Sequence, residues 1–62
     1  MKKRLQIRAD EVSDGDYLQS RGLSWSKVEG EPLHEGGEIA VFAKLRCEFY
    51  RPDEVVTVER EV

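Results

Sequence analysis

The sequence predicts an all-β protein: a small barrel of five to six short antiparallel strands, with a single helical turn before the last strand. Apolar and polar side chains alternate with a period of two in several segments, which is the period of a half-buried strand. Gly, Pro and Asp interrupt the chain at short intervals, as turns require. The 62 residues suffice for one domain, so residues 1–62 are expected to share one core.

The first predicted strand leaves the N-terminus. Leu5, Ile7 and Ala9 alternate with polar neighbours, so one face of this strand is expected to be buried. Residues 11–16 contain a Gly and several short carboxylates, which is typical of a turn. We expect Val12 to enter the core from this turn.

The middle of the chain predicts two short strands and a loop. Residues 17–20 and 23–29 are rich in β-prone side chains and are separated by an Arg-Gly turn. Residues 30–37 contain one Pro and three Gly, so we expect a long surface loop there.

Residues 38–50 show the clearest alternation. Odd positions from Ile39 to Phe49 are apolar, and Cys47 falls on this phase, so its thiol is expected to be buried and inert. The segment is long for one strand, so it forms either a bent strand across a barrel corner or a hairpin turning near residues 44–46. The absence of Gly and Asn from residues 44–46 favours the bent strand.

The last predicted strand follows residues 51–54, in which Pro52 favours a tight turn. Val56 and Val58 alternate with more polar neighbours and are expected to face the core.

Composition restricts the function. The formal net charge of −3 argues against a protein that binds by neutralising many phosphates. A single Cys allows no disulfide within the chain, which fits a reducing compartment. No apolar run has the length of a signal peptide or a membrane span, so we expect a cytoplasmic protein without a membrane partner.

Two groups of side chains are candidates for binding. Phe42, Lys44, Arg46 and Tyr50 interleave aromatic and basic residues on even positions, a pattern that stacks bases and follows phosphates. The alternative, favoured by the net charge, is that the rings close one end of the barrel and the charges are solvated. The second group consists of two aromatic residues, Tyr17 and Trp25. Their rings offer a groove for a Pro-rich peptide or, as the alternative, pack at the rim of the barrel.

Neither a catalytic nor a metal site is expected, and no cofactor is implied. His34 lies in a Gly-rich segment without a fixed partner, and its spacing from Cys47 does not suggest a nucleophile and base. An acidic set could offer oxygens to a divalent cation, but its spacing departs from the calcium-loop pattern and suits turns better: Asp10, Glu11, Asp14 and Asp16.

Two motifs carry a resemblance to a known class. Ala9-Asp10-Glu11-Val12 leads into Gly15-Asp16-Tyr17-Leu18, and Arg51-Pro52-Asp53-Glu54 precedes Val56-Thr57-Val58. In this order they resemble a Src-homology-3-like (SH3-like) small β-barrel, and they are similar to short uncharacterised proteins of actinobacteria and their phages. The resemblance implies a bacterial or bacteriophage protein that folds as a small closed barrel.

Three functions remain open. The preferred one is a non-catalytic interaction module that binds a host or virion protein through a sheet edge or the Trp25 region. The second is a nucleic-acid-binding accessory protein that uses the aromatic and basic face of residues 42–50. The third is an oligomerising structural subunit, because residues 39–50 offer apolar groups on both faces.

Overall fold

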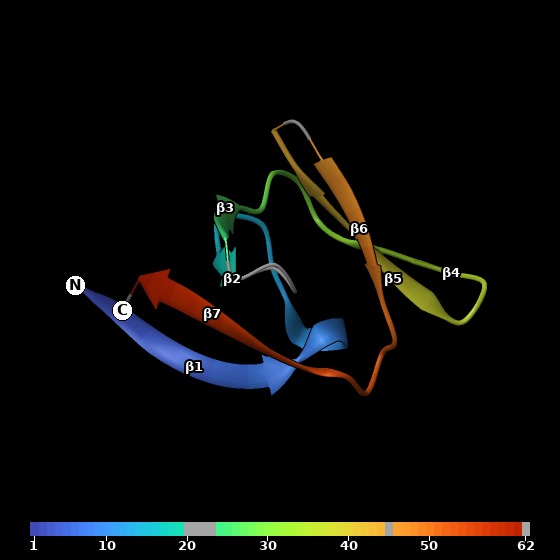
Figure 1. Ribbon diagram of the computed structural model, residues 1–62, viewed down its shortest axis with the longest axis horizontal. Helices are drawn as coiled ribbons and strands as arrows, with labels where there is room; N and C mark the ends of the chain where they lie inside the picture. The colour runs from blue at the N-terminus through green and yellow to red at the C-terminus, as the bar shows by residue number, and fades with distance from the viewer. Residues whose placement is uncertain (20–23, 45, 62) are drawn as a thin grey trace.

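The computed structural model describes residues 1–19, 24–44 and 46–61, and it confirms the all-β class. The described strands form two antiparallel sheets, β1-β7-β2-β3 and β4-β5-β6, which lie on different sides of the molecule (Figure 1). The elements are β1 (Lys2–Arg8), the 3₁₀ turn η1 (Ala9–Glu11), β2 (Tyr17–Gln19), β3 (Trp25–Lys27), β4 (Leu33–Glu35), β5 (Glu38–Ala43), β6 (Arg46–Tyr50) and β7 (Val55–Glu61).

Strand β7 organises the larger sheet. It pairs with β1 along its whole length, and Val58 lies opposite both Leu5 on β1 and Leu18 on β2. The expected inward phase of β7 is confirmed, because Val58 is fully buried whereas Val55 is 65% exposed. Val12 also enters the core, as the sequence predicted.

The smaller sheet contains two hairpins. Residues 30–37 do not form one long loop, because Leu33–Glu35 pairs with β5 as strand β4. Gly36 and Gly37 make the tight connection with φ angles of 60° and 77°, which Gly adopts without steric cost. The loop prediction was therefore wrong for the second half of that segment.

Residues 38–50 form the β5–β6 hairpin and not a bent strand. Phe42 pairs with Cys47 and Ala43 with Arg46, so the chain reverses between them. Thirteen residues in one strand would span about 43 Å, which exceeds the longest dimension of the molecule, 35 Å. The prediction for Leu45 lies outside the described residues.

The reversal shifts the inward phase by one residue. Tyr50 is 2% exposed and lies opposite buried Ile39, whereas Phe49 is 55% exposed. Cys47 is exposed, so the expectation of a buried thiol was wrong. The strand alternation was read correctly within β5, but it does not continue across the turn into β6.

The two sheets are linked at one edge and do not close into a barrel within the described residues. Val28 makes a bridge to Ala43, and the Glu29 N–H donates to the Phe42 carbonyl at 2.8 Å. The core lies between the sheets and contains Ala9, Val12, Leu18, Val28, Ile39, Val41, Tyr50, Val56 and Val58.

The helical turn lies elsewhere than predicted. Residues 51–54 form a hydrogen-bonded turn in which the Glu54 N–H donates to the Arg51 carbonyl at 3.0 Å. The 3₁₀ turn follows β1 instead, where the Ala9 N–H donates to the Glu54 carbonyl at 2.8 Å. Among the described residues no helix has the length and apolar character to span a membrane.

Candidate interaction surface

The hairpin separates the residues that the sequence placed on one face. Phe42 pairs with Cys47 and shares its face, whereas Arg46 and Tyr50 lie on the opposite face of the same sheet. Tyr50 is buried and its hydroxyl donates to Glu48 at 2.7 Å. The predicted platform of Phe42, Lys44, Arg46 and Tyr50 therefore does not exist as one surface, because a strand exchanges its faces with every residue and the turn changes the phase.

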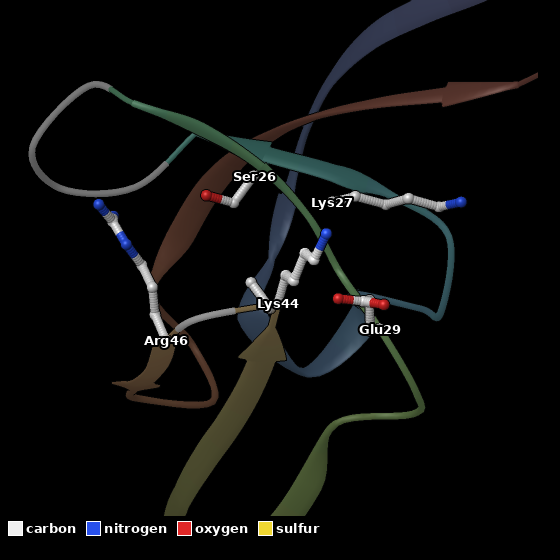
Figure 2. A pocket seen from close by; sticks show the side chains of 6 residues that line it. Ser26, Lys27, Glu29, Lys44 and Arg46 are labelled. Carbon is white, nitrogen blue, oxygen red and sulfur yellow. The ribbon is translucent and has the colours of Figure 1, made fainter.

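The structure instead gathers Lys44 and Arg46 around an open depression (Figure 2). Arg46 lies on one side of it, Lys27 and Glu29 lie on the other, and Lys44 stands between them. The depression encloses about 430 Å³ and is also lined by Ser26 and Ala43. We call it the β3–β5 depression, with the lining residues Ser26, Lys27, Glu29, Ala43, Lys44 and Arg46.

The cations of this depression have no carboxylate partner among the described residues. Within the described ranges, no salt bridge joins Lys27, Lys44 or Arg46 to an Asp or Glu. Some other cations are paired, such as Arg4 with Glu59 at 3.0 Å, whereas Lys3 and Arg51 likewise form no salt bridge with a described residue. The depression is therefore a local concentration of positive charge on a protein whose formal net charge is −3.

An apolar crevice continues from the depression into the gap between the sheets. Its walls are formed by side chains of both sheets, and Ser26, Ala43 and Arg46 line both hollows. The remaining lining residues are Leu18, Val28, Val41 and Glu48. The crevice holds only about 10 Å³ and its apolar walls are buried, so the space open to a ligand is the β3–β5 depression itself.

Tyr17 and Trp25 lie on the outer face of the larger sheet. Each ring is covered by a cation from β1: the Lys2 Nζ lies 3.4 Å from the centre of the Tyr17 ring, and the Arg4 guanidinium lies 5.2 Å from that of Trp25. Trp25 remains 38% exposed, at the edge strand that also supplies Ser26 and Lys27. The two rings share a face, but β1 covers part of the groove that the sequence suggested.

Sequence reasoning missed the role of Asp16. This carboxylate is 3% exposed and accepts hydrogen bonds from Arg60 Nε at 2.9 Å, Arg60 Nη2 at 2.8 Å and the Ser13 N–H at 2.9 Å. Burial by itself raises the pKa of Asp16, but the bonds from Arg60 and Ser13 outweigh it and lower the pKa below the ordinary 3.8. The same pairing raises the pKa of Arg60.

Three further acidic residues of the predicted set form hydrogen bonds or an ion pair within the fold. The Asp14 carboxylate accepts from the Gly30 N–H at 2.9 Å, and the Glu11 carboxylate accepts from the Arg8 N–H at 3.0 Å. Asp10 pairs with the Arg8 guanidinium at 2.8 Å. In the part of the chain that the structure describes, no cluster of His, Cys, Asp and Glu has the arrangement of a metal site.

His34 and Cys47 are not brought together. His34 lies exposed on β4 opposite Ile39, and Cys47 lies on β6, with β5 between the two strands.

Comparison with protein-family models, curated proteins and solved structures finds no match to this chain.

Proposed function

We propose that this chain is a non-catalytic interaction module, and that its β3–β5 depression binds an acidic segment of a partner protein. The observation that carries the proposal is a group of three cations, Lys27, Lys44 and Arg46, that surround a hollow and have no carboxylate partner among the described residues. A partner carboxylate that enters between them gains charge-assisted hydrogen bonds.

An acidic protein segment suits this surface better than a nucleic acid. Glu29 lies on the rim and Glu48 lines the adjoining crevice, so an extended run of phosphates would meet carboxylates as well as cations. A folded partner can place one or two carboxylates and avoid both. Single-stranded nucleic acid is the second candidate, and it is favoured by the exposed ring of Trp25 on the strand that supplies Lys27.

The test is a proton–nitrogen NMR titration of the labelled protein. The ligands are a peptide with two Glu between apolar residues and, separately, a short single-stranded oligonucleotide at low and high salt. The proposal expects the peptide to shift the amides of Ser26, Lys27 and Lys44. It is contradicted if only the oligonucleotide shifts them, or if neither ligand does.

A matched pair of variants locates the site. Arg46→Glu reverses one charge of the depression and is expected to weaken peptide binding at least about tenfold. Arg51→Glu makes the same change at an exposed residue of the 51–54 turn and should leave binding unchanged. Equal losses in both variants would indicate attraction by net charge and no defined site.

We also propose that the fold belongs to the SH3-like small barrels and that the protein is cytoplasmic, encoded by an actinobacterium or one of its phages. The support is the order of strands, with the 51–54 turn before β7, and the Val28 bridge to Ala43 at one seam. An experimental structure tests the fold. Strand hydrogen bonds that close the second seam would support the class, and two separate sheets in solution would contradict it.

A further inference from the structure

Strand β1 is an edge strand of the larger sheet, and one of its two edges has no neighbour among the described strands. The sheet order β1-β7-β2-β3 places β7 on one side of β1 and no described strand on the other. In Figure 1 the N-terminal half of β1 lies on the far side of the molecule from the β4–β5–β6 sheet. With seven residues, β1 is one of the two longest strands described. Its free edge is therefore long enough to receive another strand.

Hydrogen bonds at the end of β1 show which backbone groups face this free edge. The Ala9 N–H donates at 2.8 Å to the carbonyl just before β7, whereas the Arg8 N–H turns away from β7 and donates at 3.0 Å to a carboxylate of η1. Backbone groups of successive residues in an antiparallel strand alternate in direction. The N–H and carbonyl groups of Lys2, Arg4 and Gln6 therefore face the free edge.

Two apolar side chains of β1 are only half covered. Leu5 and Ile7 are partly buried and pack against the core, whereas their partners on β7, Val58 and Val56, are buried. Strand β7 has β1 and β2 as neighbours, while β1 has β7 alone among the described strands. The apolar area that stays exposed on Leu5 and Ile7 therefore lies along the free edge, where an added strand would bury it.

The charged side chains of β1 are all cations: Lys2, Lys3, Arg4 and Arg8. Neither Lys2 nor Lys3 forms a salt bridge with any residue in the described ranges. The Arg4 side chain pairs with Glu59 but remains 66% exposed. Pairing of the β1 edges of two copies would set cation against cation, so a second copy is disfavoured as the occupant of this edge.

Strand β7 shows which side chains suit β1 as neighbours. Valines lie opposite Leu5 and Ile7, and glutamates lie opposite Lys2 and Arg4. Each side chain of β1 is within reach of the strands on both of its sides, so the free edge presents the same order of basic and apolar groups. A segment with the order apolar-x-apolar-acidic-x-acidic therefore matches the free edge as it matches the paired one.

We propose that the free edge of β1 receives an extended acidic segment of a partner protein as an additional antiparallel strand. The backbone of the segment bonds to Lys2, Arg4 and Gln6, its apolar side chains cover the exposed parts of Leu5 and Ile7, and its carboxylates meet the cations. A nucleic acid is disfavoured, because it would meet the half-covered apolar side chains chiefly with charged phosphates. This edge is separate from the β3–β5 depression, so the inference does not depend on the function proposed for that depression.

An NMR titration with a synthetic peptide tests the proposal. The probe is the capped peptide Val-Thr-Val-Glu-Ser-Glu, which copies residues 56–61 with Ser in place of the Arg. It should shift the amides of Lys2, Arg4 and Gln6 and slow their hydrogen exchange, which should be fast in the free protein. Slow exchange without peptide would mean that the edge is already paired, and it would overturn the proposal. The same holds if the three amides do not shift, or if only a single-stranded oligonucleotide shifts them.

The same titration separates this edge from the β3–β5 depression. Peptide-induced shifts at Ser26, Lys27 and Lys44 alone would place the peptide in the depression, which overturns the edge assignment and supports the proposed function. Shifts along β1 alone support the edge assignment even if the depression binds no ligand.

Methylation of the peptide backbone distinguishes strand pairing from attraction by charge. In the register of β7, the first Glu of the peptide lies opposite Arg4 and donates its N–H to β1, whereas the Val before it lies opposite Leu5 and directs its N–H away. N-methylation of that Glu should weaken binding at least about tenfold, and N-methylation of that Val should change binding much less. Equal affinities of the two methylated peptides would contradict strand pairing, because their charges are identical.

A matched pair of variants tests the edge from the protein side. Gln6→Pro removes an N–H that faces the free edge and leaves the ladder to β7 in place, because proline is tolerated where an edge strand donates to no neighbour. It should abolish the peptide-induced shift of Arg4, whereas Gln6→Ala keeps the N–H and should bind like the wild type. Circular dichroism checks that both variants are folded. Equal binding by the two folded variants would overturn the proposal, and the methylated peptides test it independently of the fold of either variant.

Discussion

Two regions of the protein differ in whether their charged side chains have partners of opposite charge among the described residues. At the start of β2, the Asp16 carboxylate is buried and receives donors from Arg60 and Ser13, so its charge is fully compensated. Around the β3–β5 depression, Lys27 and Arg46 have no carboxylate partner among the described residues.

The difference separates charges that stabilise the fold from charges that we propose bind a partner. The Asp16–Arg60 pair joins segments 44 residues apart and fixes β7 to the turn before β2. Its loss must affect folding, because a buried charge without its partner is costly. Removing a solvated cation from the depression costs the fold little and should affect binding alone.

The largest loss of stability is expected from substitutions in the core that the two sheets share. Val58→Asp and Val41→Asp each bury an uncompensated carboxylate, at sites that are fully and almost fully buried, one in each sheet. The cost of several kcal/mol is comparable with the whole stability of a small domain, so both variants should be unfolded at room temperature. Circular dichroism and NMR dispersion check this. A native-like spectrum for both variants would refute the assigned core.

The next effect concerns the charged pair itself. Asp16→Asn keeps the size of the side chain but removes its charge, and we expect the free energy of unfolding to fall by about 2 kcal/mol. The expected loss is smaller than for a fully buried pair because the Arg60 side chain is 36% exposed and water can solvate it. Urea denaturation measures the change. Asp53→Asn, at an exposed turn residue, is the matched control and should change little.

The pH dependence of the free energy of unfolding tests the contribution of the Asp16 charge. The pKa of Asp16 is lower in the folded chain than its ordinary 3.8, so its ionised form stabilises the fold above that value. This contribution is lost as pH falls below about 3.8 and through the folded pKa. Urea denaturation at a series of acidic pH values should show a steeper decline for the wild type than for Asp16→Asn. Parallel declines would mean that Asp16 gains nothing from its partners.

The smallest effect is expected at the depression. Arg46→Glu should change the free energy of unfolding by no more than about 0.5 kcal/mol, as should the control Arg51→Glu. The reason is that Arg46 is exposed and makes no ion pair with a described residue. Thermal denaturation measures it. A loss near that of Asp16→Asn would show that the depression contributes to the fold and would remove the distinction between the two regions.

Much of the strand arrangement could be predicted from local pattern. The alternation around Leu5 and Ile7 and that around Val56 and Val58 identified β1 and β7 and their inward faces. A period of two is a local property, since each residue reverses the face of its neighbour. The prediction that Val12 enters the core was also correct and also depended on local pattern. An isolated apolar residue in a polar turn is most stable when its side chain is buried.

The candidate site was less predictable, because it depends on a turn with no sequence signal. Residues 44–46 contain neither Gly nor Asn, yet the pairing of Ala43 with Arg46 reverses the chain there. That reversal buries Tyr50, exposes Cys47 and separates Phe42 from Arg46. Periodicity could not reveal the hairpin, because a bent strand and a hairpin both alternate with a period of two.

By itself, the sequence determined the all-β class, the inward phases of β1, β5 and β7, and the turn at residues 51–54, because alternation and a fixed proline angle act over a few residues. Only the tertiary structure decided the β5–β6 phase, the Asp16–Arg60 pair and the set of cations around the depression. These features involve residues that are distant in the chain. The packing of the two sheets on one core determines which of these residues come into contact. The cations around the depression, which form no salt bridge with a described residue, are the ones proposed to bind.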